Sequence, residues 1–494
     1  MSGACSLCAQ SPADIKRWET RAAQVEIIRD THGVPHVYGK TDADAVFGFL
    51  YAQCEDNFDR IERNYLEMLG RRAEMEGPGA LYDDLLMRLI ADTADAKKDF
   101  DRSPQWLKDL LVAHADGINY YLYKHPATQP VVLKKFEPWF HLMYTDGSVS
   151  ATSTGGATTA DLKKFYGPQL QAQIKGLGLS GGTDLVRSQD QMGAKTPDQW
   201  MAAAEDAEWR GSNGFAIGRA KSASGNPLLY INPHVPFYFR CEGQMVSQQG
   251  LQAYGAATWG QFFIYQGFNE NCGWMHTTGY SDVADLYLEK VRQTAKGWVY
   301  AYEKETRAVR SKTIDLQYTE KGEMKSVRFT GYYTHHGPVV GEKDGKWMAL
   351  KEYNRSLKAL VQSWQTTKAN DLAAYTKAMQ GLSNTTNNTV YADKAGNIAY
   401  WHGNFVPKRD ARFNWALPVD GSTAATEWKG VHPLEQTVRI LNPASGFIQN
   451  CNATPFTASG KSSPKRNFYP VYMAPDGQNA RGLRAAQLLD QPNK

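Results

Sequence analysis

The spacing of apolar residues changes along the chain, and this change constrains the fold class more than any other feature of the sequence. From Asp42 to Leu69 apolar side chains recur every three or four positions, which is the spacing of one face of a long helix. Residues 24–40 before it predict a strand, a turn and a strand, and more helix follows to about His125. After Ser212, short alternating or aromatic runs between turn residues predict strands. We therefore expect an α+β protein whose first part is largely helical.

Bulk composition excludes several classes of protein. The chain has 494 residues, of which 42% are hydrophobic, so it is long and apolar enough for an enzyme-sized globular body. Its 55 basic and 51 acidic residues are spread along the sequence and contain no basic block, which argues against a nucleic-acid partner. The sequence contains no window of about 18 uninterrupted apolar residues, so it predicts no membrane span. Residues 1–18 lack the basic and apolar regions of a complete signal peptide, so either a leader has been removed or none is made.

The cysteines are too few and too scattered for a disulfide framework, and we expect most of them to be buried thiols. They are Cys5, Cys8, Cys54, Cys241, Cys272 and Cys451. Cys5 and Cys8 have the spacing of a redox motif or of half a zinc site. The second pair that zinc needs is absent, and no strand precedes the motif, so this function is the weaker interpretation.

One conventional nucleophile motif occurs at Gly178–Gly182, where Ser180 satisfies the G-x-S-x-G pattern. A nucleophile elbow needs an apolar strand directly before the serine and a helix after it. The residues before Ser180 are polar and typical of a helix. A flexible glycine loop is therefore favoured, and a conventional serine hydrolase that uses Ser180 is kept as an alternative.

Ser212 offers different chemistry if the peptide bond between Gly211 and Ser212 is cut. The new terminus would carry a hydroxyl nucleophile and a free α-amine, whose pKa of about 7.7–8.0 leaves it substantially unprotonated near neutral pH. One residue would then supply both the nucleophile and the base. Gly211 suits such a cut, because a residue without a side chain permits a tight, strained peptide that the hydroxyl can attack. Alone, Gly-Ser-Asn is a common turn.

Four motifs in a fixed order make the pattern around Ser212 much more specific. They are RGSNGFAIG, INPHVPF, GWMHTTGYSDVADLY and FIQNCNATP. In order and spacing they resemble the penicillin acylase, cephalosporin acylase and acyl-homoserine-lactone acylase family of N-terminal nucleophile hydrolases. Residues 27–61 are also similar to the start of that family's small chain. The resemblance implies a four-layer αββα fold, in which two stacked antiparallel sheets are covered by helices.

The resemblance also implies that the chain is a precursor that cuts itself. We expect a mostly helical small chain, residues 1–182, a linker or spacer, residues 183–211, and a large chain, residues 212–494, that contains the catalytic sheets. The small chain would end near Gly182 or at Gly211. Family members generally continue beyond the equivalent of Lys494, so we expect the large chain to be incomplete at its C-terminus.

The resemblance assigns catalytic roles around the cut. They fall on the nucleophile Ser212, on His234 beside it, on the oxyanion donors Thr278 (backbone N–H) and Asn452 (side-chain amide), and on the orienting Arg481. Each oxyanion donor is worth roughly a hundred- to a thousandfold in rate. Asn450 is a rival of Asn452 in the same motif, although an asparagine here could simply make a turn. Arg484 lies one helical turn from Arg481, so the choice between these two arginines stays open.

A structural calcium ion is implied by the same resemblance. Its ligands would be the carboxylates of Asp282 and Asp285 and the carbonyl oxygens of Ala284 and Pro418, which are the hard oxygen donors that calcium prefers. The glutamate that the small chain should add cannot be identified within residues 143–156. We expect no cofactor for the chemistry itself.

The adjacent pair His335 and His336 lies in an alternating run. We expect this run to be a strand, so the two rings should point to opposite faces and be poor joint ligands.

The acyl-binding pocket is predicted less sharply. Val235 stands where a penicillin G acylase has phenylalanine, which suggests a wider or deeper mouth. Phe262 and Phe263, together with Tyr265 and Phe268, could line an apolar slot for a fatty or aryl acyl chain. At alternating strand spacing the same residues are more often plain sheet core.

The implied reaction is hydrolysis of a small-molecule N-acyl amide through an acyl-enzyme, by a heterodimer of the protein's own two chains. Acyl-homoserine lactones, lipopeptides and β-lactams are the candidate substrates. By the same resemblance we expect the protein to be periplasmic or secreted. The rival from another class is a sheet-rich binding protein that keeps the scaffold and is never processed.

Overall fold

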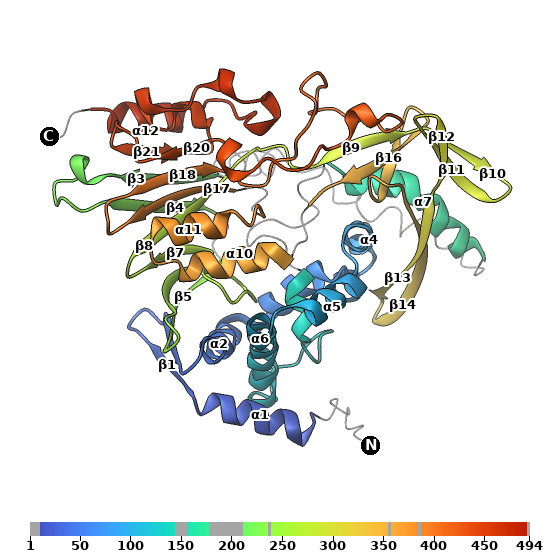
Figure 1. Cartoon of the computed structure of the whole chain (residues 1–494). Helices are drawn as coiled ribbons and strands as arrows, with labels where there is room; N and C mark the ends of the chain where they lie inside the picture. The colour runs from blue at the N-terminus through green and yellow to red at the C-terminus, as the bar shows by residue number, and fades with distance from the viewer. Residues whose placement is uncertain are drawn as a thin grey trace, which may run out of the picture.

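Figure 1 shows the computed structural model, which describes residues 10–143, 156–176, 211–235, 239–353, 357–383 and 387–491. Several predictions fall outside these residues and are not tested by the structure. They concern Cys5 and Cys8, Ser180, the chain end at Gly182, the spacer before Gly211, and the search for a small-chain glutamate in residues 144–155.

The first elements follow the predicted order of helix and strand. Helix α1 (Pro12–Ala22) leads to a hairpin of β1 (Val25–Arg29) and β2 (Pro35–Gly39), and the long helix α2 (Asp42–Met68) comes next. Helix α2 begins at a capping box, in which the side chains of residues 41 and 44 each accept the other's backbone N–H. The predicted strand, turn, strand and long helix are confirmed.

Further helices complete the first part of the chain. They are α3 (Ala73–Glu76), α4 (Leu81–Ile90), α5 (Thr93–Arg102), α6 (Gln105–Lys124) and α7 (Thr159–Gly176). Among them α6 packs along α2. Helices α2 and α6 touch closely at Gly117, where an added Cβ would lie 2.4 Å from the carbonyl oxygen of Phe47. Only glycine permits this approach.

A nine-stranded sheet joins the hairpin of the first part to strands from the second part. Its order is β1-β2-β5-β6-β7-β8-β17-β18-β20. The added strands are β5 (Arg240–Ser247), β6 (Gln252–Thr258), β7 (Gln266–Asn269), β8 (Cys272–Thr278), β17 (Asn387–Asp393), β18 (Ile398–His402) and β20 (Arg439–Leu441). Strand β2 pairs in parallel with β5, so the two parts of the chain share one sheet.

A second sheet of three strands packs against the large sheet. Its order is β21-β3-β4, with bounds Phe447–Asn450, Gly211–Ile217 and Leu228–His234. Ala216 and Ile448 of this sheet meet Met275 and Val390 of the large sheet in one apolar cluster. Burial of this interface is what holds the two sheets face to face.

Helices cover both outer faces of the stacked sheets (Figure 1). Helix α12 (Ala480–Leu489) lies on the small sheet, whereas α10 (Leu357–Lys368) and α11 (Leu372–Met379) pack on the large one. The order of layers is helix, sheet, sheet, helix. The predicted α+β, four-layer αββα fold is confirmed.

The remaining strands form smaller sheets that the sequence pattern did not separate. Strands β15 (Val339–Lys343), β16 (Lys346–Lys351), β9 (Asp285–Glu289) and β19 (Val419–Asp420) make a four-stranded sheet. Strands β10 (Val291–Thr294), β11 (Gly297–Tyr302) and β12 (Glu305–Ala308) make another. Strands β13 (Arg310–Glu320) and β14 (Glu323–Tyr333) form a long hairpin, which packs against α4 and α7.

Two general predictions can be checked against the described residues. Cys54, Cys241, Cys272 and Cys451 are all buried and free, as expected. Among the helices of the described part, not one combines the length and the apolar character that crossing a bilayer requires.

Candidate active site

Ser212 lies near the start of β3, the central strand of the small sheet. It stands opposite Pro233 of β4, and its neighbour Asn213 stands opposite Asn232. Its side chain and backbone are 5% exposed. Ser212 is therefore held near the end of a central strand, a rigid position of the kind that a nucleophile requires.

Gly211 has a backbone that other residues adopt only with strain. Its φ is +152°, and an added Cβ would lie 2.4 Å from Asn452 Oδ1 and 2.8 Å from Arg481 Nη2. The hydroxyl of Ser212 donates a hydrogen bond of 2.6 Å to the carbonyl oxygen of Gly211. In the uncut chain the hydroxyl thus lies against the peptide group that the sequence predicts to be broken.

Asn452 contacts the nitrogen of Ser212 directly. The N–H of Ser212 donates to Asn452 Oδ1 at 2.5 Å, and Asn452 Nδ2 donates to the carbonyl oxygen of Thr278 at 3.0 Å. Asn452 has a φ of +58°, a left-handed conformation that asparagine tolerates better than most residues. This turn of the backbone brings its amide between Ser212 and the end of β8.

Asn450, the rival of Asn452, faces the interior instead. It is 1% exposed and accepts hydrogen bonds from Thr277 Oγ1 at 2.6 Å and from the N–H of Asn452 at 2.9 Å. Its own amide donates to Tyr400 and to the carbonyl oxygen of Ala453. Asn450 therefore shapes the loop that presents Asn452.

Arg481 is the arginine that reaches Ser212. It lies in the first turn of α12. Asn479 caps this helix, because its side chain accepts the N–H of Gly482. Arg481 Nη1 donates to the carbonyl oxygen of Ser212 at 3.1 Å, and its Nη2 donates to Asn452 Oδ1 at 3.1 Å. Arg484 is exposed on the same helix, so the geometry favours Arg481.

His234 and Thr278 complete the set that the sequence predicted. His234 stands opposite Gly211 in the strand register, and its Nε2 lies 3.0 Å from Asn232 Oδ1 and 3.2 Å from Asn213 Nδ2. Thr278 ends β8 and is exposed. Sequence reasoning missed Asn213, which also accepts from Arg481 Nη1 at 2.7 Å and so links the histidine to the arginine. Its place directly after Ser212 was the available signal.

The carboxylates expected to bind calcium are paired with a buried arginine. Arg409, whose side chain is 0% exposed, donates from Nε to Asp285 Oδ2 at 2.7 Å and from Nη2 to Asp282 Oδ1 at 3.2 Å. Its Nη1 donates to the carbonyl oxygen of Asp282 at 2.6 Å. Ala284 lies between the two aspartates, and Pro418 directly precedes β19. The guanidinium occupies one oxygen of each carboxylate and makes the residues a poor fit for a calcium ion, although Asp285 Oδ1 has no hydrogen-bond partner among the described residues. Calcium binding itself stays a prediction.

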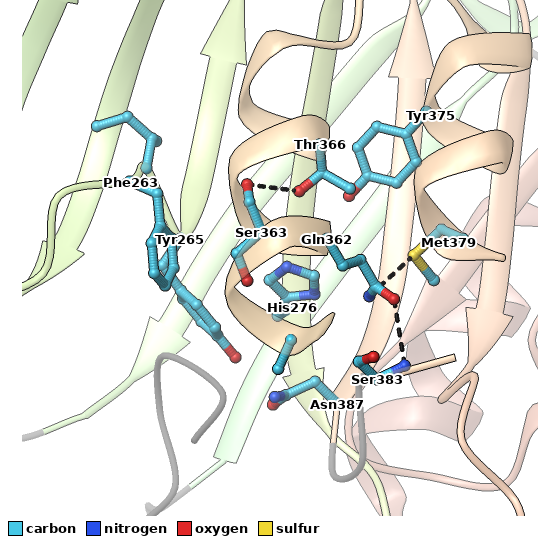
Figure 2. Close-up of a pocket in the computed structure, with 12 residues that line it drawn as sticks. Phe263, Tyr265, His276, Gln362, Ser363, Thr366, Tyr375, Met379, Ser383 and Asn387 are labelled. Atoms are coloured by element: carbon cyan, nitrogen blue, oxygen red, sulfur yellow. Dashed lines mark hydrogen bonds between the residues drawn. The ribbon is translucent and has the colours of Figure 1, made fainter. Parts of the chain in front are cut away.

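A pocket opens beside the end of β8 (Figure 2). Phe263 and Tyr265 line one side of it, and His276 lies at its centre. Side chains of α10 and α11, including Gln362, form the opposite wall. Asn387, which also lines the pocket, is the strand partner of Thr278, so pocket and Ser212 site meet at the same strand end.

The aromatic run occupies three different environments. Phe263 faces the pocket, but Phe262 is fully buried against His141 and Trp364, away from it. Phe268 is 53% exposed on β7, and Val235, 39% exposed, does not line this pocket. The expected strand is wrong here, because Phe262–Tyr265 form the irregular connection between β6 and β7. Irregular backbone does not alternate faces.

The fold and this arrangement define the class of protein. A four-layer αββα sandwich with Ser212 at the head of a central strand is the architecture of N-terminal nucleophile hydrolases. Residues 24–494 match the family model described as penicillin amidase, and the chain therefore belongs to that family.

Individual relatives are distant. The chain is 27% identical over 472 residues to penicillin acylase 2 proenzyme of Pseudomonas sp. (strain SE83). This alignment covers 87% of the present chain and 58% of the proenzyme. The chain is also 27% identical over 523 residues to an acyl-homoserine lactone acylase of Pseudomonas syringae pv. syringae, covering 95% and 64%. Among solved structures, a thermostable penicillin G acylase from Alcaligenes faecalis superposes with a TM-score of 0.44 at 20% identity, covering 56% of this chain and 52% of that one. The chain thus spans about three fifths of the length of these curated relatives.

Proposed function

We propose that the chain is a self-processing hydrolase of N-acyl amides, with Ser212 as its nucleophile. The observation that carries this proposal is the contact between the Ser212 hydroxyl and the Gly211 carbonyl oxygen, 2.6 Å apart. In the first step the hydroxyl oxygen attacks the Gly211 carbonyl carbon, and the peptide becomes an ester as the serine nitrogen takes up a proton. Water then hydrolyses this ester, which leaves a carboxylate on Gly211 and a free amine on Ser212.

The freed amine acts as the base in each later turnover. Its pKa of about 7.7–8.0 in an unperturbed terminus allows it to accept the hydroxyl proton while the serine oxygen attacks the acyl carbonyl. The backbone N–H of Thr278 and the amide of Asn452 hold the developing oxyanion. The proton passes to the leaving amine, and water then releases the acyl group from the serine ester.

Asn452 and Arg481 orient the amine in this proposal. Asn452 Oδ1 already lies 2.5 Å from the serine nitrogen, and Arg481 Nη2 lies 3.1 Å from the same oxygen. His234 positions Asn213, whose side-chain amide it contacts, and in this way shapes the site beside the nucleophile.

The pocket at the end of β8 is the proposed acyl site. Phe263 and Tyr265 offer aromatic surface, whereas His276, Gln362 and Asn387 offer polar groups. This mixture of aromatic and polar groups suits an acyl amide but does not select one class of substrate, so we propose acyl-homoserine lactones, lipopeptides or β-lactams. The names of the relatives, a penicillin acylase and an acyl-homoserine lactone acylase, support the same range.

The mature enzyme would be a heterodimer of a small chain, residues 1–182, and a large chain, residues 212–494, after loss of residues 183–211. The parallel pairing of β2 with β5 supports this, because it adds one hairpin of the small chain to the edge of the sheet of the large chain. The relative called a proenzyme is consistent with such processing. A periplasmic or secreted location is part of the same proposal.

Expression of the wild type and of two variants tests the function. Wild type should give two bands on a denaturing gel, and N-terminal sequencing of the larger band should read Ser-Asn-Gly-Phe. Ser212→Ala should give one full-length band without amidase activity, whereas Ser180→Ala should behave as wild type. Amide hydrolysis by a chain whose Gly211–Ser212 bond is intact would overturn the proposal. Loss of activity in Ser180→Ala with normal processing would support the conventional alternative.

A further inference from the structure

Two histidines and two glutamates meet at the edge of the four-stranded sheet, on a different sheet from Ser212. Glu289 ends β9, and Glu427 follows a short turn at 424–426. His335 and His336 lie in the bend between β14 and β15. The prediction that the two rings point to opposite faces is wrong, because a bend does not alternate sides as a strand does. Their ring centroids are 3.8 Å apart.

Both imidazole rings direct the same atom at the same oxygen. His335 Nε2 lies 2.8 Å from Glu427 Oε1, and His336 Nε2 lies 3.1 Å from that oxygen. One nitrogen or oxygen from each of Glu289, His335 and His336 also lies within 4.8 Å of the other two. The two Nε2 atoms thus face one oxygen of Glu427, and Glu289 lies beside them.

The second nitrogen of each ring is already held by a partner. His336 Nδ1 lies 2.7 Å from Glu289 Oε1, and His335 Nδ1 lies 3.0 Å from the hydroxyl of Tyr300. Ligating histidines in metal sites are oriented in this way by a carboxylate or another polar group on the non-ligating nitrogen. Tyr287, stacked on His336 with ring centroids 3.7 Å apart, fixes the plane of that ring.

The charges around the cluster leave room for a cation. Glu289 is fully buried, and its Oε2 has no hydrogen-bond partner among the described residues. Lys351 Nζ binds Glu427 Oε2 at 3.0 Å and supplies one positive charge against two carboxylates. A buried carboxylate in excess requires either a proton on a neighbour or a metal ion.

We propose that His335 Nε2, His336 Nε2 and Glu427 Oε1 bind a divalent transition-metal ion of the zinc type. Bonds of about 2.0–2.1 Å to nitrogen and oxygen place tetrahedral ligand atoms about 3.3 Å apart, so the distances of His335 Nε2 and His336 Nε2 from Glu427 Oε1, 2.8 and 3.1 Å, need to grow by only about 0.5 and 0.2 Å. The side chains of His335 and Glu427 are 27% and 23% exposed, which provides a path for the ion and a position for water as fourth ligand. Imidazole and carboxylate together suit zinc and its neighbours in the first transition row.

Metal titration of the full chain tests this site. Protein stripped with a chelator is titrated with Zn²⁺ in a calorimeter and with Co²⁺ by visible absorption, which reports tetrahedral coordination. We expect one ion per chain, and at least a tenfold loss of affinity in both His335→Ala and Glu427→Gln. His432→Ala is the matched control, because this half-buried histidine bonds to Gln436 and Tyr472 outside the cluster.

A milder variant protects the test against a folding defect. Tyr300→Phe removes only the hydroxyl that holds His335 Nδ1, and it should weaken binding about tenfold, as loss of an outer partner does elsewhere. Circular dichroism checks that each variant is folded. No binding by wild type, or equal binding by wild type, His335→Ala and Glu427→Gln, would overturn the proposal and leave a proton on His336 as the balancing charge.

The metal site and the proposed hydrolase fail separately. Ser212→Ala should bind Zn²⁺ as wild type does, because no residue of the cluster contacts Ser212 or Asn452. Metal binding in that variant therefore reports on this site alone.

Discussion

At the scale of single residues, the site depends on the absence of a side chain at Gly211. Gly211 has no Cβ, and the space that a Cβ would need is filled by Asn452 Oδ1 and Arg481 Nη2. A larger residue must therefore move either the scissile peptide or the two groups that hold Ser212.

Gly211→Ala should slow self-cleavage by about a hundredfold or more, because a displacement of about 1 Å at a reacting group has an effect of that size. The measurement is the fraction of cut chain against time on a denaturing gel. Gly477→Ala is the control, since an added Cβ there meets nothing within 4 Å. Cleavage of Gly211→Ala at the wild-type rate would show that this contact does not set the geometry.

Arg409 pairs with the two carboxylates that the resemblance implies as calcium ligands. Removing it in Arg409→Ala leaves Asp282 and Asp285 without their guanidinium, and the protein should lose about 3–5 kcal/mol of unfolding free energy, as when one partner of a buried ion pair is removed. Thermal denaturation measures the loss. Arg412→Ala, which removes an exposed arginine paired with Asp410, should change little.

The same experiment addresses the metal. With Arg409 in place, a calcium-selective chelator should leave the melting temperature of wild type unchanged. A fall in the melting temperature on chelation would show that calcium binds in spite of the arginine.

At the scale of elements, β8 connects the pocket with the loop that presents Asn452. His276 and Thr278 alternate with Thr277 along this strand, and Thr277 faces Asn450 in the loop that presents Asn452. Because His276 lines the pocket, protonation of its ring changes the charge beside the pocket. Burial lowers the pKa of His276 from its ordinary 6.5 to about 4.

A lowered histidine pKa gives a definite pH dependence. The unfolded chain binds a proton below about pH 6.5 and the folded chain only near pH 4, so stability is full above this range and is lost as the pH falls through it. His276→Gln should reduce the slope of unfolding free energy with pH by about 1 kcal/mol per pH unit within that range. Denaturant titrations at several pH values measure the slope. Parallel slopes for variant and wild type would contradict the low pKa.

The sequence predicted elements well where a local rule decides them. The hairpin of β1 and β2 and the helix α2 follow from the spacing of apolar residues and from the capping box at the start of the helix. Ser212 lies on a strand, as expected. The prediction failed at Phe262–Tyr265 and at His335–His336, because apolar or alternating letters do not reveal an irregular connection or a bend.

The set of site residues was also predictable only in part. The motifs named Ser212, Asn452 and Arg481, which the structure brings together. They could not show Arg409, which lies more than a hundred positions from both aspartates that it binds. Such long-range ion pairs are set by tertiary packing and leave no local pattern.

At the scale of the whole molecule, the large sheet is shared between the two predicted chains. Val37 of β2 is fully buried and stands opposite Met245 of β5, whereas its neighbour Tyr38 is 39% exposed. The cohesion of the cut protein should therefore depend on one face of β2.

Val37→Lys should destabilise the protein by about 3 kcal/mol or more, since it buries an unpaired charge. Size-exclusion chromatography should show the two chains of cut wild type in one peak and separated chains for the variant. Tyr38→Lys is the matched control and should elute as wild type. Co-elution of both chains in Val37→Lys would mean that other contacts suffice.

The partners of Ser212 come from far along the chain, and this has a consequence for timing. Asn452 and Arg481 lie 240 and 269 positions after the serine. A nascent polypeptide still on the ribosome lacks at least one of the two groups until translation has passed residue 481. The proposed cut therefore cannot precede the synthesis of residue 481, so a product aborted before that point stays in one piece and carries no exposed catalytic amine.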